Sequence, residues 1–493
     1  MSLRLWLVLI ANVAGLPLLA HGDTLTIRED DGNVVTVEAR WVGERPGVIA
    51  IERSDGRIEL IPQQQLVKRE PGPDPEPITC EQMADRLKEE FGADLFRSHI
   101  VQPYVVGLVL SEPLPKTSDA RVANCLKKGA EFMKKVEKAF LDFAKELKIE
   151  LESPRYPLAL LIFETDDDFM KFTTKETGGK GLTAGAILGY YSGLTNRLVI
   201  RMSECHSMST PLHEAIHQQT FNRGIMKRLA PVPVWFSEGI ATGFEGNSDK
   251  INGKRPLQVN KSYIGAAIRA KTVNWDHVVA DDAAFRGDVL AGEAYGNAWS
   301  IHWFLVTKYR KQYVDYLKII SEKNPLETED ARTRVQDFER VFGKTIGKLQ
   351  SEFPPWIESA AKKQNISLVD KVPVGHLVAQ SNLAEVELTA SKAGANSDVE
   401  TEGRMRNLSQ IRPMSFHITL ETDAGTYAEW YLPSVDPQKG MTLPKQTAEK
   451  RMVKAPQKAN ANTFRIKVKS VVPESETGKA WRRGQLPTPV FSG

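Results

Sequence analysis

Two histidines, His213 and His217, lie four residues apart in the segment Thr210-Pro-Leu-His-Glu-Ala-Ile-His217. Thr210 as an N-cap, followed by proline in the first turn, predicts that this segment is a helix. On a helix the two imidazoles project from one face, about one turn apart. Two neutral imidazoles at that spacing can hold one zinc ion, and Glu214 between them can reach a water on the metal.

A third ligand must come from another element, and Glu238 is placed to supply it. Twenty residues separate it from His217, which is enough for the helix to end, a loop to turn and a second helix to begin near Trp235. The alternative is a surface helix whose histidines are solvated and whose Glu214 pairs with a lysine. The capped helix and the second motif at this distance favour the metal site.

At these residues the chain resembles the gluzincin metallopeptidases, the thermolysin-like group in which two histidines and a distant glutamate bind zinc. Trp235-Phe-Ser-Glu-Gly-Ile-Ala241 is similar to the ligand helix of zinc aminopeptidases, and to an uncharacterised family of secreted bacterial proteins with both motifs. The resemblance covers about residues 95–360. It implies one zinc ion bound by His213, His217 and Glu238, with Glu214 as the general base.

Two departures and one further residue refine this resemblance. The Gly-x-Met-x-Asn strand that holds a free amino terminus in zinc aminopeptidases is absent, which favours an endopeptidase. Thermolysin-type enzymes carry an aspartate four residues after the glutamate ligand, where this chain has Thr242. Tyr295 occupies the place of a tyrosine that stabilises the oxyanion in zinc aminopeptidases; the alternative is a tyrosine of the core. His302 shares its helical face and is expected to be packed inside.

The amino terminus predicts export. Residues 1–22 contain a positive flank at Arg4, an apolar stretch over residues 5–20 and small residues at a plausible cleavage site. That stretch is short for a membrane span, and no later stretch reaches about eighteen consecutive apolar residues. We therefore expect a secreted, periplasmic or cell-surface protein without a stable membrane span.

Composition indicates an ordinary folded protein, with 41% hydrophobic and 26% charged residues. A net charge of +3 over 493 residues is too small to indicate a nucleic acid or an anionic membrane as partner. Three cysteines are an odd number for an exported chain. Cys80 and Cys125 could form a bridge, which would leave Cys205 free; Cys205 precedes the histidine helix and is not expected to bind metal.

The two ends of the chain are predicted to be β-rich. Short strands and Asp-Gly turns over residues 23–70 indicate a small SH3-like β-barrel, either a module that binds a partner protein or the cell surface, or a spacer. The proline-rich residues 71–77 indicate a stiff linker. Residues 366–493 predict a sandwich-like β domain, with polar segments 390–403 and 438–461 as loops.

The central region, residues 78–365, is predicted to be a thermolysin-like zincin domain, which makes the whole chain α+β. Apolar spacing predicts helices over residues 80–91 and 118–147 and strands over 100–110 and 156–163. Three acids from Asp166 suit a helix start better than calcium. By resemblance, part of a hairpin at residues 184–191 lines the substrate groove; the alternative is an ordinary edge hairpin.

These features predict an exported zinc endopeptidase that acts on a protein or peptide substrate. The alternative is a surface adhesion or binding protein, in which a peptidase-like scaffold is inactive and the terminal β modules make the contacts.

Overall fold

The structure is a computed structural model that describes residues 22–178, 187–206, 209–245, 251–260, 263, 274–285, 291–363, 372–392, 399–446, 463–473, 476–484 and 486. The predicted signal segment lies outside the described residues, apart from Gly22. The described elements are mixed α+β, with the strands in four separate sheets. The chain divides into two compact units, one with Met1–Ser54 and Ile58–Glu76, the other with Asp55–Arg57 and Pro77–Gly493.

The first unit is an open antiparallel sheet in the order β4-β3-β2-β1-β5. Its strands are β1 (Gly22–Arg28), β2 (Val34–Arg45), β3 (Val48–Glu52), β4 (Ile58–Pro62) and β5 (Leu66–Pro71). A closed barrel requires hydrogen bonds between its edge strands. Here β4 and β5 are the two edge strands, joined in sequence by a single 3-10 turn. In the sheet, β5 pairs with β1 and not with β4. The predicted closed barrel is therefore not formed by the described residues.

The second unit is built on a mixed five-stranded sheet in the order β6-β7-β8-β10-β9. Its strands are β6 (Phe96–Val101), β7 (Tyr104–Val109), β8 (Leu158–Phe163), β9 (Gly189–Tyr191) and β10 (Arg197–Arg201). Residues 100–110, predicted as a single strand, instead contain the end of β6 and all of β7, which pair as an antiparallel hairpin. Strand β9 lies antiparallel to β10 at one edge; of the predicted groove segment, residues 184–186 lie outside the described residues.

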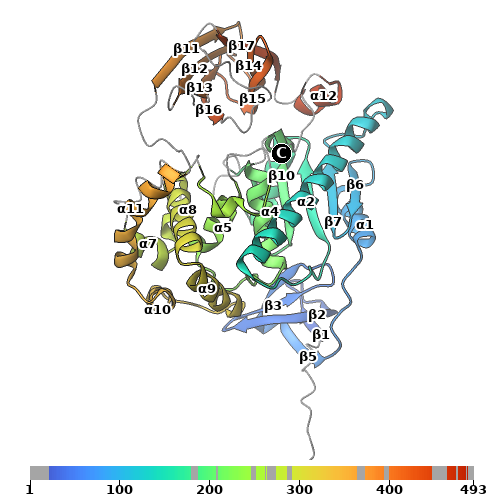
Figure 1. The fold of residues 1–493 in the computed structure, drawn as a ribbon. Coiled ribbons are helices and arrows are strands. Elements are labelled where there is room, and N and C mark those ends of the chain that lie inside the picture. Colours follow the sequence, from blue (N-terminus) through green and yellow to red (C-terminus); the bar gives the residue numbers. More distant parts are fainter. Residues whose placement is uncertain are drawn as a thin grey trace, which may run out of the picture. The chain divides into compact units, whose positions relative to one another are not determined.

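Helices cover both faces of this sheet (Figure 1). Adjacent residues of β7 show the division: Val105 packs in the core beneath α1 and α3, and Val106 packs in the core beneath α2 and α4. A strand covered on both faces needs apolar residues at every position, as in β8. The helices are α1 (Cys80–Phe91), α2 (Asp119–Leu147), α3 (Asp166–Thr177) and α4 (Ser209–Asn222). Of these, α1 and α2 confirm the helices predicted over residues 80–91 and 118–147.

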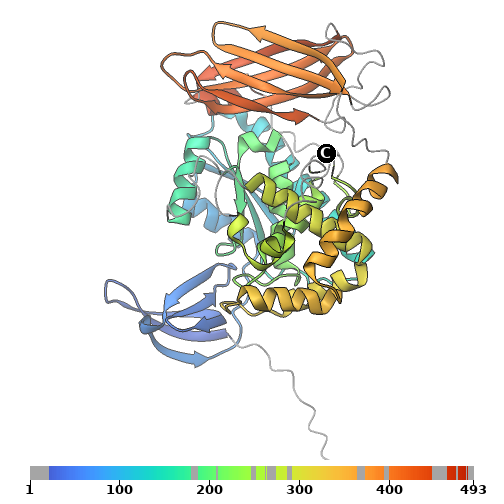
Figure 2. The same cartoon turned by 90° about the vertical axis from the view of Figure 1, so that its left-hand side faces the viewer.

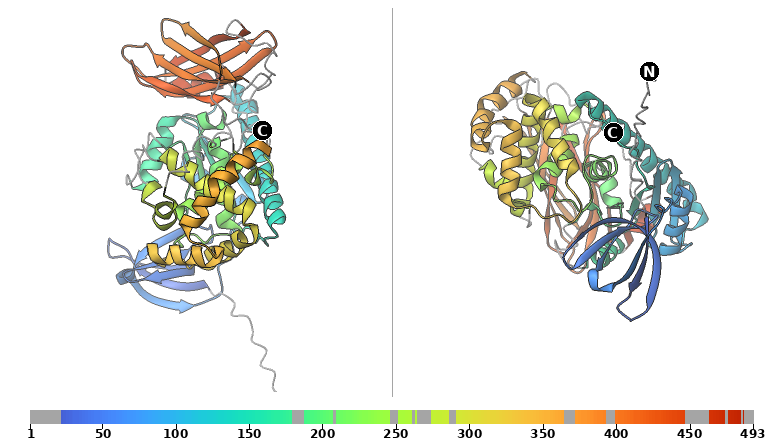
Figure 3. Two further views of the ribbon diagram at one scale, coloured as in Figure 1. Left: turned by 60° about the vertical axis from the view of Figure 1, so that its left-hand side comes forward. Right: turned by 90° about the horizontal axis from the view of Figure 1, so that it is seen from below.

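A group of helices follows α4 in the chain (Figure 3). It comprises α5 (Val234–Phe244), α7 (Trp275–Ala280), α8 (Ala291–Lys308), α9 (Arg310–Glu322), α10 (Ala331–Phe342) and α11 (Ile346–Lys363). Helices α5 and α8 approach closely at Gly239, where an added Cβ would lie 2.8 Å from both the Ala298 carbonyl oxygen and the His302 Cβ. Among the described helices, none has the length and apolar character to cross a bilayer.

Gly239→Ala is expected to destabilise the second unit by about 1–3 kcal/mol, because the methyl group must push α5 away from a backbone carbonyl of α8. The matched control is Gly347→Ala on the exposed start of α11, where an added Cβ meets nothing within 4 Å. There alanine should be neutral or stabilise by up to about 1 kcal/mol. Urea unfolding midpoints measure both changes; equal midpoints for the two variants would contradict the close packing.

The strands from residue 372 form two sheets around one core (Figure 2). Their orders are β11-β12-β13-β16 and β15-β14-β17. The strands are β11 (Val372–Gln380), β12 (Ala384–Lys392), β13 (Val399–Asn407), β14 (Met414–Thr422), β15 (Gly425–Val435), β16 (Gly440–Gln446) and β17 (Arg465–Pro473). The loops predicted over residues 390–403 and 438–461 are thus partly strand, because residues such as Ala390, Val399 and Leu443 pack into this core.

A buried ion pair joins the last described helix, α12 (Thr477–Arg482), to the central sheet. Arg482 donates to both carboxylate oxygens of Glu164 at 2.7 Å, and the two side chains are 3% and 0% exposed. Ser111 donates to the same carboxylate from its backbone N–H and its hydroxyl. Trp481 packs into the core that α2 and α4 cover. The segment after β17 therefore completes the core of the second unit.

The three cysteines are free and buried. Cys80 lies in the core beneath α1, whereas Cys125 and Cys205 lie in the core on the opposite face of the sheet. The bridge considered between Cys80 and Cys125 is not formed, because the sheet separates them.

Candidate metal centre

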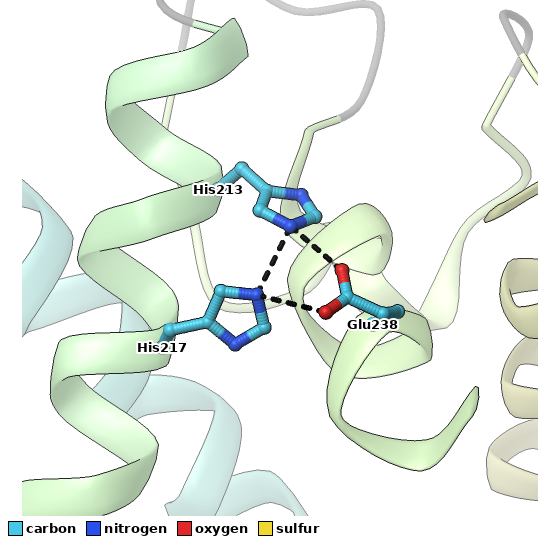
Figure 4. A group of neighbouring side chains, drawn as sticks. All are labelled: His213, His217 and Glu238. Carbon is cyan, nitrogen blue, oxygen red and sulfur yellow. Dashed lines mark hydrogen bonds and ion pairs between the residues drawn. The ribbon is translucent and has the colours of Figure 1, made fainter. Parts of the chain in front are cut away.

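Helices α4 and α5 position the predicted ligands. Helix α4 begins at Ser209, so Thr210 lies in its first turn and does not cap it; the Thr210 hydroxyl instead donates to Glu204 at 3.0 Å. His213 and His217 follow on one face of α4, and Glu238 lies on α5. Figure 4 shows both imidazoles turned toward the Glu238 carboxylate.

Three donor groups converge between the two helices. His213 Nε2 lies 2.9 Å from Glu238 Oε2, and His217 Nε2 lies 3.5 Å from Glu238 Oε1. The two Nε2 atoms are 3.0 Å apart. Among the described residues these three side chains form the one cluster of metal-ligating groups.

The opposite nitrogens of both imidazoles have their own partners. His213 Nδ1 lies 2.5 Å from Glu245 Oε1, and His217 Nδ1 lies 3.1 Å from the Ser237 hydroxyl. An ionised carboxylate only accepts hydrogen bonds, so His213 donates from Nδ1 and, when neutral, presents a lone pair at Nε2. This lone pair, the facing imidazole and the Glu238 carboxylate together form a donor set that could hold a metal ion.

The donor set is of a kind that zinc sites use. Zinc prefers imidazole nitrogen and carboxylate oxygen, and ligand atoms about 2.1 Å from a tetrahedral zinc lie about 3.4 Å from one another. The three separations of 2.9, 3.0 and 3.5 Å are near that value. If zinc were bound there, three protein ligands would leave a fourth position for water, as in catalytic zinc sites.

The electrostatics of the cluster favour positive charge. Burial acts to raise the pKa of Glu238, but the charges and hydrogen bonds of the two histidines outweigh it and hold this pKa well below its ordinary value. Burial acts to lower the pKa of His213, but hydrogen bonds to Glu238 and Glu245 raise it well above the ordinary value. A metal ion would supply this positive charge in place of the proton on His213.

Glu214 points toward the edge strand β9. Its Oε2 accepts a hydrogen bond of 2.9 Å from the backbone N–H of Tyr191, the last residue of β9. Burial raises the pKa of Glu214 above its ordinary value, although the charges of His213 and His217 act in the opposite direction. A raised pKa makes the carboxylate a stronger base.

Tyr295 of α8 lies beside the ligands. Its ring meets the ring of His213 edge to face, with 5.8 Å between the centroids. Burial, and then the charges of nearby carboxylates, raise the pKa of Tyr295 above its ordinary value. The phenol therefore keeps its proton and remains a hydrogen-bond donor.

The region around this cluster matches a known family model. Residues 207–327 match a family described as "Protein of unknown function (DUF1570)". The match includes the three clustered side chains, Glu214 and Tyr295. No curated protein matches the chain.

Other residues considered from the sequence are engaged elsewhere. His302 is fully buried, with Nδ1 2.9 Å from the Tyr313 hydroxyl, and burial lowers its pKa to about 3. Cys205 lies with its sulfur 3.7 Å from the Arg201 carbonyl oxygen. Asp166, first of the three acids, pairs with Arg201 at 3.0 Å inside the protein. The expected packing of His302 inside the protein is thus confirmed.

Sequence reasoning missed the residues that hold the histidines. Ser237 and Glu245 lie within or beside the second motif, but their contacts run between α5 and α4. One signal was present: Glu245 follows Glu238 by seven residues, which places it two turns along the same helical face.

Proposed function

We propose that the protein is an exported zinc-dependent endopeptidase. The observation that carries this proposal is the convergence of His213 Nε2, His217 Nε2 and the Glu238 carboxylate, with Glu214 and Tyr295 beside them. One metal-binding cluster, one base and one phenolic donor are what peptide hydrolysis by activated water requires.

The architecture supports the same proposal. In thermolysin-like folds the strand before the histidine helix borders the cleft and pairs with the substrate backbone. Here β9 is antiparallel at the sheet edge, and its last residue contacts Glu214 on α4. We assign residues 78–365 to a thermolysin-like zincin domain on this basis. We further propose that the open sheet of residues 23–70 belongs to the SH3-like group, which its strand order supports, and that the two sheets from residue 372 form a sandwich-like domain.

The residues of the chain divide the chemistry between them. Zinc, when bound, supplies Lewis acidity that makes water nucleophilic near neutral pH. Glu214 Oε2 is held by the Tyr191 N–H, which leaves Oε1 to accept the proton from the attacking water. Glu214 then donates this proton to the departing amine. The Tyr295 hydroxyl donates a hydrogen bond to the oxyanion that develops on the scissile carbonyl.

Metal content tests the proposal directly. The purified full chain should bind about one zinc per molecule, and His217→Ala should lose it, because two protein ligands hold zinc far more weakly than three. The matched control is His99→Ala, which removes an exposed histidine of β6 and should keep the zinc. Elemental analysis after dialysis gives the ratio. Absence of zinc from the wild-type chain supplied with zinc at neutral pH would favour the surface-binding alternative.

A further inference from the structure

We propose that Glu245 orients His213 for metal binding, an inference that rests on the proposed zinc site. Glu245 Oε1 lies 2.5 Å from His213 Nδ1. The contact selects the tautomer in which Nδ1 carries the proton, so that the Nε2 lone pair faces His217 and Glu238. Partners of this kind fix the ring and raise the basicity of the ligand nitrogen. Glu245 is thus a positioning residue that acts through His213.

The Glu245 carboxylate is itself held from several sides. Its Oε2 accepts hydrogen bonds from the Tyr263 hydroxyl at 3.0 Å and from the Ser209 hydroxyl at 3.3 Å. The side chain is only 12% exposed. Because Ser209 is the first residue of α4 and Glu245 follows the last residue of α5, these contacts also join the two ligand helices. Hydrogen bonds to both of its oxygens therefore hold the Glu245 carboxylate in place.

Glu245 takes a role that the corresponding aspartate of thermolysin-type enzymes would fill from the position of Thr242. Thr242 is fully buried, and its hydroxyl donates to the Glu238 carbonyl oxygen at 2.7 Å, within its own helix. In this chain the acidic partner therefore lies three residues after Thr242, just beyond the end of α5. His217 has a neutral partner, the Ser237 hydroxyl at 3.1 Å, so the two histidines are held unequally.

Zinc affinity of the full chain tests this role. Metal-free wild type, Glu245→Ala, Glu245→Gln and the control Thr242→Ala are titrated with zinc against a chromophoric chelator. Glu245→Ala should weaken zinc binding about 10–100-fold. Glu245→Gln should weaken zinc binding less than Glu245→Ala does, since the glutamine amide oxygen still accepts a hydrogen bond from His213 Nδ1. Thr242→Ala should stay within about twofold of wild type, because the helix carbonyls keep their backbone partners.

Two further readouts separate positioning from a general loss of structure. Thermal unfolding of the metal-free proteins should place Glu245→Gln close to wild type. The visible spectrum of the cobalt-substituted protein should change in Glu245→Ala and return toward wild type in Glu245→Gln, because cobalt absorption reports ligand geometry. Zinc bound equally well by wild type and Glu245→Ala would overturn the role of Glu245 and leave the zinc site standing. No zinc on the wild type would overturn both proposals.

Discussion

Glu214→Gln should reduce peptide hydrolysis by about 10²–10⁴-fold while leaving about one zinc per chain in place. Glutamine has the same shape and its amide oxygen can still accept the Tyr191 N–H, but it cannot take a proton from water. The three clustered side chains are unchanged, so metal binding and folding should be retained. Initial rates on an unfolded protein substrate such as casein, with zinc content measured on the same samples, test both parts.

The control for Glu214→Gln is the same chemical change at Glu352 of α11. That carboxylate accepts hydrogen bonds from Lys308 and Lys344 and contacts none of the three clustered side chains. Glu352→Gln should retain wild-type activity. Equal rates for wild type and Glu214→Gln would show that another group is the base, whereas loss of zinc in Glu214→Gln would point to a structural role.

Arg482→Leu should destabilise the second unit by about 3–5 kcal/mol, because it leaves the Glu164 carboxylate buried without its cation. The guanidinium also donates to the backbone carbonyls of Glu112 and Pro113, at 2.7 and 3.1 Å, which would lose these bonds. The urea unfolding midpoint, followed by tryptophan fluorescence, measures the loss.

Two comparisons test the cause of that loss. Arg465→Leu removes the cation of an exposed pair with Asp423, whose side chains are 61% and 94% exposed, and should cost at most about 1 kcal/mol. The double variant Glu164→Leu with Arg482→Leu should recover part of the stability, since no charge is then left buried alone. A midpoint for Arg482→Leu equal to that of Arg465→Leu would contradict the anchoring role.

Local patterns carried most of the predictable information. Helical spacing placed His213 and His217 on one face, and a loop of suitable length brought Glu238 next to them. The buried strand β8 and the long helix α2 were also predictable, because continuous or periodic apolar residues need no knowledge of their partners. Metal binding and catalysis themselves stay predictions.

Contacts between distant segments were not predictable in this way. Glu245 reaches His213 only because α5 packs beside α4, and Glu164 meets a partner 318 residues away. Strands β13 and β16 consist largely of polar residues, so their composition predicts loops and gives no sign that they pair in a sheet. Excluding a bridge between Cys80 and Cys125 required knowledge of which face of the sheet each residue occupies.

The long separation of Glu164 and Arg482 also sets the timing of folding during synthesis. A ribosome that adds roughly 5–20 residues per second needs about 16–64 s to extend the chain by the 318 positions from Glu164 to Arg482. Until then the carboxylate at the end of β8 has no cation and the core lacks Trp481. The nascent chain thus carries the His213-to-His217 and Trp235-to-Ala241 segments well before the core that supports them is complete.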